Sequence, residues 1–240
     1  MWRGKTLTVI LPTYREKESI KQVIEGFEKL GICDEIIVIN NNAENGTSEE
    51  IAQTSAREVH ETIQGYGAAI KRGLRESNGD LTAICEPDST FKPSDLEKLL
   101  VFTDQCEFVI GSRTVESFIW TGANMGYFLK WGNWFVAKLM ELLFNSASLS
   151  DVGCTFRVVS KKVIAEYDLE RFKNDGRFGM EYLLSAVMAQ ESVVQVPVNY
   201  LPRIGVSGYT GNFKGAFHLG VKMIILIMRR RIGRRNYYFV

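Results

Sequence analysis

Two acidic side chains, Glu86 and Asp88, come directly after the apolar run Leu81–Cys85 and are separated by Pro87. Carboxylates one residue apart at the end of a buried strand can share a hard divalent cation, Mg²⁺ or Mn²⁺, which keeps open positions for diphosphate oxygens. The alternative is a capped turn, because proline and aspartate both favour turns. Taken alone, the triplet favours the turn, so the metal interpretation depends on the neighbouring segments.

A second polar segment, Pro12–Glu16, follows the first apolar run of the chain, Thr6–Leu11. Pro12 is expected to stop the strand, the ring of Tyr14 can stack on a nucleotide base, and Glu16 lies close to the start of a helix. The alternative is an ordinary helix start in which an acidic side chain interacts favourably with the helix dipole. The two interpretations are compatible.

Two other turns carry groups that can contact a nucleotide. Asn40 and Asn41 follow the apolar run Glu35–Ile39, and their amides can read a base edge. Gly67 leads into a helical stretch, where glycines let backbone amides approach a phosphate. The alternatives are an ordinary Asn/Gly turn and glycines that merely allow tight packing.

A parallel sheet would bring these segments together. The first 112 residues alternate short β-type runs with amphipathic helical stretches, which is typical of a parallel sheet with crossover helices. The polar loops at the carboxyl ends of such strands are where open α/β sheets bind ligands. The expected strands are Thr6–Leu11, Glu35–Ile39, Leu81–Cys85, Phe108–Ile110, Thr155–Ser160 and Val193–Val198, and the expected helices are Ser19–Leu30, Ala68–Arg75, Ser94–Phe102 and Met180–Ala189.

Composition limits the class of protein. With 240 residues, 45% hydrophobic and 24% charged, the chain is long enough for one large α/β domain and too apolar for wholesale disorder. The net charge of +1 gives no sign of nucleic-acid binding. The four cysteines lack paired spacing and predict buried free thiols in a reducing compartment. The N-terminus does not read as a secretory signal, and no apolar run is long enough to predict a spanning helix.

Two apolar segments predict contact with a membrane surface. Ala216–Met228 is too short to span a bilayer but suits its interface, and the arginines after it suit anionic headgroups. Met125–Phe144, which contains two tryptophans, can lie in the same way and accept a lipid tail. The alternative is a pair of core or dimer-interface helices, so a homo-oligomer or a membrane-anchor partner stays open. The arginines in question are Arg229, Arg230, Arg231, Arg234 and Arg235.

The order and spacing of these segments, taken together, favour the ligand-binding interpretation of each one over its structural alternative. The runs PTYRE, INNNAENGT, GYGAAIKRGLRESNGD, EPD and Gly111–Arg113 resemble the inverting nucleotide-sugar glycosyltransferases of family 2. The closer likeness is to the polyprenyl-phosphate (dolichyl-phosphate mannose synthase-like) branch, whose later motifs are similar to Asp151–Arg157, Glu181 and Val196–Ser207. The likeness covers roughly residues 6–230.

The resemblance implies a GT-A fold, which is an α/β fold with a Rossmann-like, mostly parallel sheet flanked by helices, followed here by C-terminal amphipathic interface helices. Residues 1–214 would form the catalytic domain, with an apolar amphipathic insertion at 113–150, and residues 215–240 a basic membrane-surface helix and tail. Together with the residue types, the resemblance implies nucleotide binding by Pro12, Thr13, Tyr14, Glu16, Asn40, Asn41 and Gly67. It implies metal binding by Glu86 and Asp88, and catalytic roles for Asp88, Asp151, Glu181, Arg113 and Arg203. Acceptor or mobile-loop roles fall to Arg157 and Ser207.

Some residues depart from the family pattern. The family usually has two aspartates where Asn40 and Asn41 stand, and Asp where Glu86 stands. Glutamate still binds metal, with a longer arm. An amide both donates and accepts, which matches the N–H beside a carbonyl in uracil and favours UDP over GDP, and cytosine is also compatible.

The expected reaction is a metal-assisted inverting displacement from a nucleotide-diphosphate sugar to a lipid-linked acceptor, with polyprenyl phosphate as the first candidate. Mg²⁺ or Mn²⁺, together with Arg113 or Arg203, would stabilise the leaving diphosphate. A phosphate acceptor is already anionic and needs no general base. An alcohol would need one, from Glu181 or Asp151, although Glu181 also reads as a solvent-facing charge on an amphipathic helix.

The expected location is peripheral, on the cytoplasmic face of a membrane. Two other functions remain as alternatives. A sugar nucleotidyltransferase would carry a Gly-rich first loop, which PTYRE is not. A non-catalytic nucleotide-binding partner subunit of the same fold is suggested by Asn40, Asn41 and Glu86.

Overall fold

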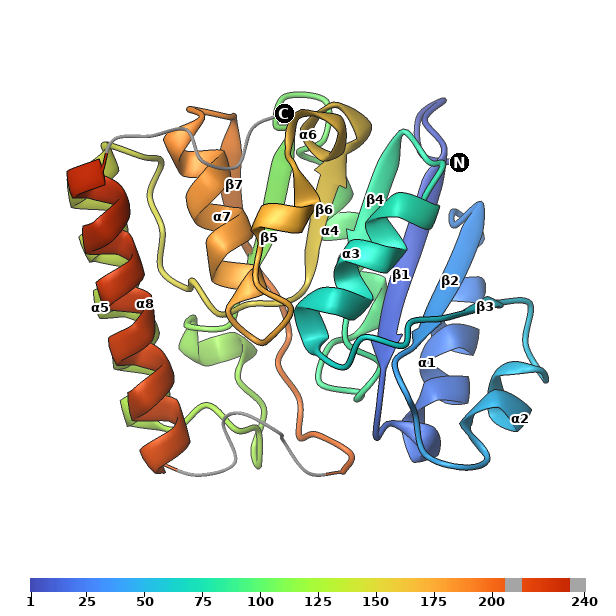
Figure 1. The fold of residues 1–240 in the computed structure, drawn as a ribbon. Coiled ribbons are helices and arrows are strands. Elements are labelled where there is room, and N and C mark those ends of the chain that lie inside the picture. Colours follow the sequence, from blue (N-terminus) through green and yellow to red (C-terminus); the bar gives the residue numbers. More distant parts are fainter. Residues whose placement is uncertain (206–212, 234–240) are drawn as a thin grey trace.

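The computed structural model describes residues 1–205 and 213–233. Its centre is a 7-stranded sheet with the strand order β3-β2-β1-β4-β6-β5-β7 (Figure 1). Neighbouring strands are parallel except where β6 pairs with β4 and β5, which are antiparallel ladders. This mostly parallel sheet confirms the expected fold class. The strands are β1 (Leu7–Thr13), β2 (Glu35–Asn40), β3 (Arg57–His60), β4 (Leu81–Ile84), β5 (Phe108–Ser112), β6 (Arg157–Ser160) and β7 (Val193–Pro197).

Helices cover both faces of the sheet. α3 packs on β1 and β2 and contacts α7, and these two helices lie in front of the sheet in Figure 1, with α1 and α4 behind it. The helices are α1 (Lys17–Glu28), α2 (Thr47–Ile51), α3 (Tyr66–Glu76), α4 (Leu96–Leu100), α5 (Tyr127–Phe144), α6 (Lys161–Glu166), α7 (Phe178–Met188) and α8 (Phe213–Gly233), and the 3-10 turns are η1 (Pro93–Asp95), η2 (Glu116–Phe118) and η3 (Leu169–Arg171).

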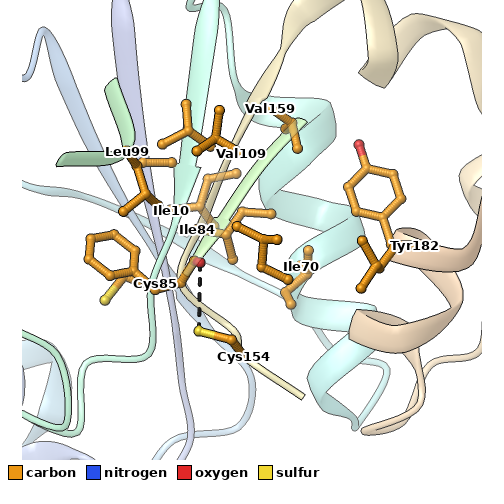
Figure 2. Close-up of a cluster of buried hydrophobic side chains, with 14 of the residues drawn as sticks. Ile10, Ile70, Ile84, Cys85, Leu99, Val109, Cys154, Val159 and Tyr182 are labelled. Carbon is orange, nitrogen blue, oxygen red and sulfur yellow. Dashed lines mark hydrogen bonds between the residues drawn. The ribbon is translucent and has the colours of Figure 1, made fainter. Parts of the chain in front are cut away.

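The core lies between the sheet and these helices. All seven residues of β1 are buried, as a central strand with both faces covered requires. Figure 2 shows Ile10, Ile84, Val109 and Val159 from four strands of the sheet gathered in one apolar cluster. The cysteines of the chain are free thiols, as expected, but only Cys85 and Cys154 are buried, while Cys33 and Cys106 are partly exposed.

The expectation that Pro12 stops the first strand is wrong. β1 continues to Thr13, and Pro12 pairs in register with Ile39 of β2. The carbonyl of Thr13 accepts a hydrogen bond from the residue after β2, so the backbone of Pro12 faces the opposite side, toward β4. β4 ends at Ile84, opposite Ile10, so the missing N–H of Pro12 breaks no ladder there.

The predicted strands and longer helices are all present, with shifts of a few residues at their ends. The sequence reading missed β3, α2 and α6. β3 is an edge strand whose end residues Arg57 and His60 are exposed, so it lacks the apolar run that marks a buried strand. α2 and α6 have five and six residues, too few for a helical period to show.

α5 and α8 lie side by side at one end of the molecule (Figure 1). α5 also contacts α7, which joins the pair to the rest of the fold. Asn145, in the left-handed conformation with φ of 51°, ends α5. Within the two described ranges, no helix is long and apolar enough to cross a membrane.

Candidate active site

The polar ends of several strands meet at one edge of the sheet. β1 and β4 are neighbours at the point where the strand order reverses direction, and open α/β sheets bind ligands at such a point. β6 runs the opposite way, so its first residue, Arg157, lies opposite Ile84 of β4 and Ile110 of β5 at this same edge. A cavity of about 820 Å³ lies here.

The cavity has a polar part and an apolar part. The polar part is lined by these predicted site residues: Pro12, Thr13, Tyr14, Glu16, Asn41, Glu86, Arg113, Arg157 and Arg203. The apolar part lies along α5 and α8, with Phe128, Leu129, Val136, Leu219, Met223 and Ile224. The lining does not include Asn40, Gly67, Asp88, Asp151 or Glu181, and Ser207 lies outside the described residues.

Three carboxylates converge on the guanidinium of Arg203. Its Nη2 lies 2.9 Å from Oε1 of Glu16, and its Nη1 lies 2.8 Å from Oδ2 of Asp88 and 3.7 Å from Oε2 of Glu86. Asp88 is 1% exposed, and its other oxygen accepts hydrogen bonds from the backbone and hydroxyl of Thr90. The remaining oxygen of Asp88 and the carboxylate of Glu86 therefore already share one cation.

This pair of carboxylates has the chemistry of a divalent-metal site. Burial first, and then the charge of Asp88, raises the pKa of Glu86 to about 8, and a bound cation relieves both effects. Carboxylate oxygens are the ligands that Mg²⁺ and Mn²⁺ prefer. Across residues 1–205 and 213–233, no three His, Cys, Asp or Glu side chains gather as metal ligands.

Glu16 organises the loop between β1 and α1. Its Oε2 accepts hydrogen bonds from the backbone of Tyr14 and Arg15 at 2.7 and 2.9 Å and from the hydroxyl of Thr13 at 3.2 Å. Tyr14 is 41% exposed at the cavity, and the guanidinium of Arg15 lies 4.9 Å from its ring centre. The carboxylate thus shapes the loop, and the Tyr14 ring stays partly exposed at the cavity.

The structure gives no support to the expectation that Asn40 and Asn41 offer amides to a base, because both amides are hydrogen-bonded inside the protein. Asn40 donates to Glu58 and accepts from a backbone N–H. Asn41 donates to two backbone carbonyls and accepts from Gln64 and from the N–H of Gly65. Asn41 therefore ties the end of β2 to the loop before α3, and the argument for uracil from free amides no longer holds.

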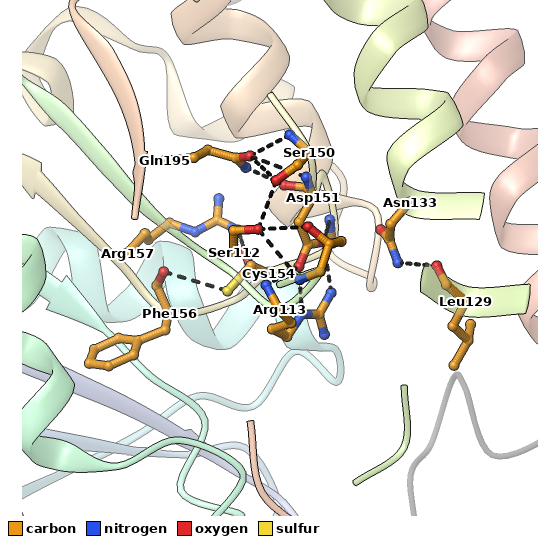
Figure 3. Close-up of polar contacts among 12 residues, drawn as sticks. Ser112, Arg113, Leu129, Asn133, Ser150, Asp151, Cys154, Phe156, Arg157 and Gln195 are labelled. Carbon is orange, nitrogen blue, oxygen red and sulfur yellow. Dashed lines mark hydrogen bonds and ion pairs between the residues drawn. The ribbon is translucent and has the colours of Figure 1, made fainter. Parts of the chain in front are cut away.

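Asp151 holds Arg113 at the cavity wall (Figure 3). Asp151 is fully buried and accepts hydrogen bonds from Nε and Nη2 of Arg113, at 2.8 and 3.0 Å, and from the N–H groups of Arg113 and Gly153. Burial opposes its charge, but the guanidinium and these hydrogen bonds keep the pKa of Asp151 below its usual value. The guanidinium also lies 5.2 Å from the ring centre of Tyr200. A Cβ at Gly153 would come within 2.8 Å of Oδ1 of Asn133 and 2.9 Å of Nη2 of Arg113, so a larger residue there would displace these side-chain ends.

Three other predicted site residues, Arg157, Gly67 and Glu181, mainly contact other parts of the protein. Arg157 is buried, and donates to the carbonyls of Cys154 and Gly179. Gly67 lies in the first turn of α3, where a Cβ would come within 2.2 Å of the carbonyl of Lys173, which favours the packing interpretation. Glu181 is 2% exposed, so its reading as a solvent-facing charge is wrong. α7 is buried on nearly every side, and this burial raises the pKa of Glu181.

The sequence reading missed contributors to this site. Tyr66 lines the cavity from the start of α3, although its neighbours in the GYG run were noted for their backbone only. Gln195 of β7 hydrogen-bonds to the Ser150–Asp151 backbone, and an isolated glutamine in a strand gives no signal in a single sequence. Met125–Phe144 was anticipated as a lipid contact, and α5 does line the apolar part of the cavity.

The outward faces of α5 and α8 expose large apolar side chains. On α5, Tyr127 and Leu142 are each 81% exposed. On α8, Ile232 is 80% exposed beside the arginines of its last turn. Trp131, Trp134, Ile225 and Met228 are also at least 40% exposed, as are Phe128, Phe135 and Phe217, which line the cavity. Large apolar side chains exposed together on one pair of helices are typical of an interaction site in a folded protein.

Known proteins resemble this chain in sequence and in fold. The profile of the family described as Glycosyl transferase family 2 matches residues 8–168. The low-salt glycan biosynthesis hexosyltransferase Agl6 of Haloferax volcanii is 28% identical over 206 residues, which is 83% of this chain but only 49% of that protein. The chain thus spans about half the length of this relative.

Other relatives match nearly end to end. A dolichyl-phosphate hexose transferase of Haloferax volcanii is 22% identical over 94% of this chain and 96% of that protein. An undecaprenyl-phosphate mannosyltransferase of Micrococcus luteus is 24% identical over 88% and 90% of the two chains. Among solved structures, the glucosyl-3-phosphoglycerate synthase of Mycobacterium tuberculosis in complex with Mg²⁺ and UDP has a TM-score of 0.74 at 16% identity, covering 96% of this chain and 80% of that one. This likeness establishes a shared fold.

Proposed function

Because this chain belongs to glycosyl transferase family 2, in the branch of the polyprenyl-phosphate sugar transferases, we propose that it moves a hexose from a nucleoside-diphosphate hexose to a polyprenyl phosphate. The observation that carries the proposal is the continuity of one cavity, whose charged part adjoins an apolar part along α5 and α8. A diphosphate donor suits the first part, and the isoprenoid chain of a lipid acceptor suits the second.

We propose that Glu86 and Asp88 hold Mg²⁺ or Mn²⁺, which would neutralise charge on the departing nucleoside diphosphate. Arg113 lines the cavity with its guanidinium already oriented, so it can bind phosphate oxygens without reorganisation. Arg203 occupies the carboxylates that the metal would use, so metal binding would free its guanidinium for the diphosphate or the acceptor phosphate.

No general base is required by this reaction, because the acceptor phosphate is already anionic at neutral pH. The surroundings of Asp151 and Glu181 support this view. Asp151 has a lowered pKa and four hydrogen bonds, and Glu181 accepts a hydrogen bond from the backbone of Lys173 outside the cavity lining. We assign both carboxylates to positioning.

UDP is the nucleotide that we propose for the donor. The support is the set of UDP complexes of the Mycobacterium tuberculosis synthase, whose fold this chain shares, and those complexes also contain Mn²⁺ or Mg²⁺. Asn40 and Asn41 give no support, because their amides are already hydrogen-bonded. The donor test therefore includes GDP-hexoses at equal concentration.

The transfer test uses the full chain with Mn²⁺, a panel of UDP- and GDP-hexoses, and detergent-dispersed polyprenyl phosphate. We expect release of nucleoside diphosphate and a lipid-linked sugar by mass spectrometry, with no product when polyprenol replaces polyprenyl phosphate. Asp88→Asn should lower the rate roughly 100-fold or more, the usual scale for losing a transition-state electrostatic contact. Asp104→Asn is the matched control, because it removes a 41% exposed carboxylate that pairs with Arg3 away from the cavity.

Two results would contradict the transfer proposal. The first is no nucleotide release with any donor while the melting temperature shows a folded protein. The second is an Asp88→Asn protein that matches the parent in rate and in Mn²⁺ dependence.

We also propose that the exposed faces of α5 and α8 bind a membrane surface as a peripheral contact. The apolar side chains would enter the interface, and Arg229, Arg230 and Arg231 would contact anionic headgroups. Anionic lipids are typical of the cytoplasmic leaflet, so we place the protein on that face. This position would bring the apolar part of the cavity close to the lipid acceptor.

The membrane test is flotation with liposomes of anionic and of neutral lipid. Leu142→Ser and Trp131→Ser, which remove side chains 81% and 57% exposed, should each weaken binding. Burial of a large apolar side chain contributes about 1.5–3 kcal/mol, so a roughly tenfold loss or more is expected for each. Ile63→Ser is the matched control, because Ile63 is 57% exposed and lies on neither helix. Equal flotation of all these proteins, or none by the parent on anionic lipid, would contradict the proposal.

A further inference from the structure

We propose that Gln195 of β7 is a positioning residue that fixes the carboxylate of Asp151 and, through it, the guanidinium of Arg113 before any ligand binds. The inference concerns this chain's own side chains and holds for any phosphate-bearing ligand of the cavity. It rests on the proposed function only where transfer is the readout.

Both polar groups of the Gln195 side chain, the carbonyl oxygen and the amide nitrogen, make hydrogen bonds. Its carbonyl oxygen accepts hydrogen bonds from the N–H of Ser150 at 2.6 Å, from the hydroxyl of Ser150 at 3.2 Å and from the N–H of Asp151 at 3.2 Å. Its amide nitrogen donates to the carbonyl oxygen of Asp151. Four contacts from one side chain therefore fix both backbone groups of Asp151 (Figure 3).

These contacts matter because Asp151 lies in an irregular segment. Residues 149–156, between α5 and β6, include no helix or strand residue, so no ladder holds the carboxylate in place. A loop without such support has more conformational freedom than the elements that it connects. The hydrogen bonds of Gln195 take the place of the missing ladder, because they attach the backbone of Asp151 to strand β7.

Arg113 and Asp151, which form the ion pair, are both attached to the ladder between β5 and β7. β5 and β7 pair in parallel, with Ile110 opposite Gln195, and Arg113 follows directly after the end of β5. A closed ring of contacts results, from β5 through Arg113, Asp151 and Gln195 to β7 and back to β5. The hydroxyl pair of Ser112 and Ser150, at 2.8 Å, makes a second bond across this ring.

The ring leaves Arg113 as a cation held in a fixed orientation at the cavity wall. The carboxylate of Asp151 accepts its hydrogen bonds from Arg113 and Gly153. It therefore acts on ligands only through the guanidinium of Arg113. Arg203 differs, because two of its three carboxylate partners, Glu86 and Asp88, are the groups that would hold the metal. A cation oriented in advance stabilises developing phosphate charge without a reorganisation cost.

The test compares Gln195→Met, which keeps the length and loses these hydrogen bonds, with Gln195→Glu, which keeps the accepting oxygen. Val196→Ala is the matched control, because it weakens the same strand at a side chain 7% exposed and outside the ring. Each change is also made in an Arg113→Met background. If Gln195 acts through Arg113, its effect on function disappears there, because coupled residues are not additive.

Two readouts separate this inference from the transfer proposal. The first is the NMR signal of the Arg113 Nε–H group, assigned by its loss in Arg113→Met, which needs no activity. We expect Gln195→Met to broaden or shift it, and Gln195→Glu, which keeps the accepting oxygen but loses the donor to the Asp151 carbonyl, to change it less. Val196→Ala should leave it unchanged while lowering the melting temperature. The second is kcat/KM for transfer, expected to fall roughly 10- to 100-fold in Gln195→Met, the range for removing hydrogen-bonded support of an active side chain.

An Arg113 signal unaffected by Gln195→Met would overturn the inference. So would a fall in kcat/KM of equal size in the Arg113→Met background, because that result would show a general structural effect. If the parent transfers no sugar, the proposed function fails, and the NMR comparison still decides the role of Gln195.

Discussion

Replacing Asp151 with asparagine should destabilise the protein strongly, although the two side chains have nearly the same shape. Asp151 is fully buried and pairs with Arg113, whose side chain is 12% exposed. An asparagine can keep one accepting oxygen, but its amide nitrogen faces a donor and the guanidinium loses its counter-charge. The change therefore leaves a largely buried cation without compensation.

The size of the effect follows from the burial of both partners. Removing one member of a buried ion pair typically costs about 3–5 kcal/mol, against about 0–1 kcal/mol for an exposed pair. For a chain of this length, 1 kcal/mol corresponds to roughly 2–4 °C in melting temperature, so we expect a fall of at least about 6 °C. Asp151→Asn combined with Arg113→Met should be more stable than the sum of the two single losses, because the double change removes the unpaired charge.

The pH dependence gives a second check. The pKa of Asp151 is below its usual value in the fold, so the pair contributes stability above the unfolded-state pKa of about 3.9, and this contribution is lost as the pH falls through the folded-state value. The difference between the parent and Asp151→Asn should therefore shrink under acid conditions.

Urea unfolding followed by tryptophan fluorescence, at pH 7 and at the lowest pH where the parent stays folded, measures both effects. A loss below about 1 kcal/mol at pH 7 would place the pair with exposed ion pairs and refute the reasoning. Strict additivity of the two substitutions would refute it as well.

Three more outcomes follow from buried contacts. Because the pKa of Glu86 is about 8, raised by burial and by Asp88, Mn²⁺ must displace a proton at neutral pH. Mn²⁺ affinity, measured by electron paramagnetic resonance, should rise up to about tenfold per pH unit toward pH 8 and level off above it, and a flat profile between pH 6 and 9 would contradict this. The folded-state pKa of Glu86 lies above the reference value of 4.5, so the metal-free protein should lose stability as the pH rises from 4.5 to about 8. Glu86→Gln should remove that loss, measured by urea unfolding. Gly67→Ala would place a Cβ within 2.2 Å of the Lys173 carbonyl and should cost about 1–3 kcal/mol in thermal unfolding, whereas Gly132→Ala, with nothing within 4 Å, should not destabilise.

The amino-acid sequence by itself determined most of the elements and the edge where the site lies. Apolar runs such as those of β1 and β4 identify buried strands, because a strand covered on both faces needs a nearly continuous apolar sequence. The polar residues after these runs, Glu16 and Glu86 among them, then fall at the carboxyl ends of neighbouring parallel strands. The apolar faces of α5 and α8 are likewise visible as long apolar stretches.

Only the tertiary structure decided which polar groups are available to a ligand. Asn41 and Asp151 both look like ligand-contacting residues, but one holds the loop before α3 and the other holds a guanidinium 38 residues away in sequence. Arg203 meets Glu16 across 187 residues, and the amide of Gln195 reaches Asp151 across 44. The physical reason is that a hydrogen-bonding group satisfied inside the fold is lost to ligands, and its partners are set by packing between distant segments, which a single sequence does not encode locally.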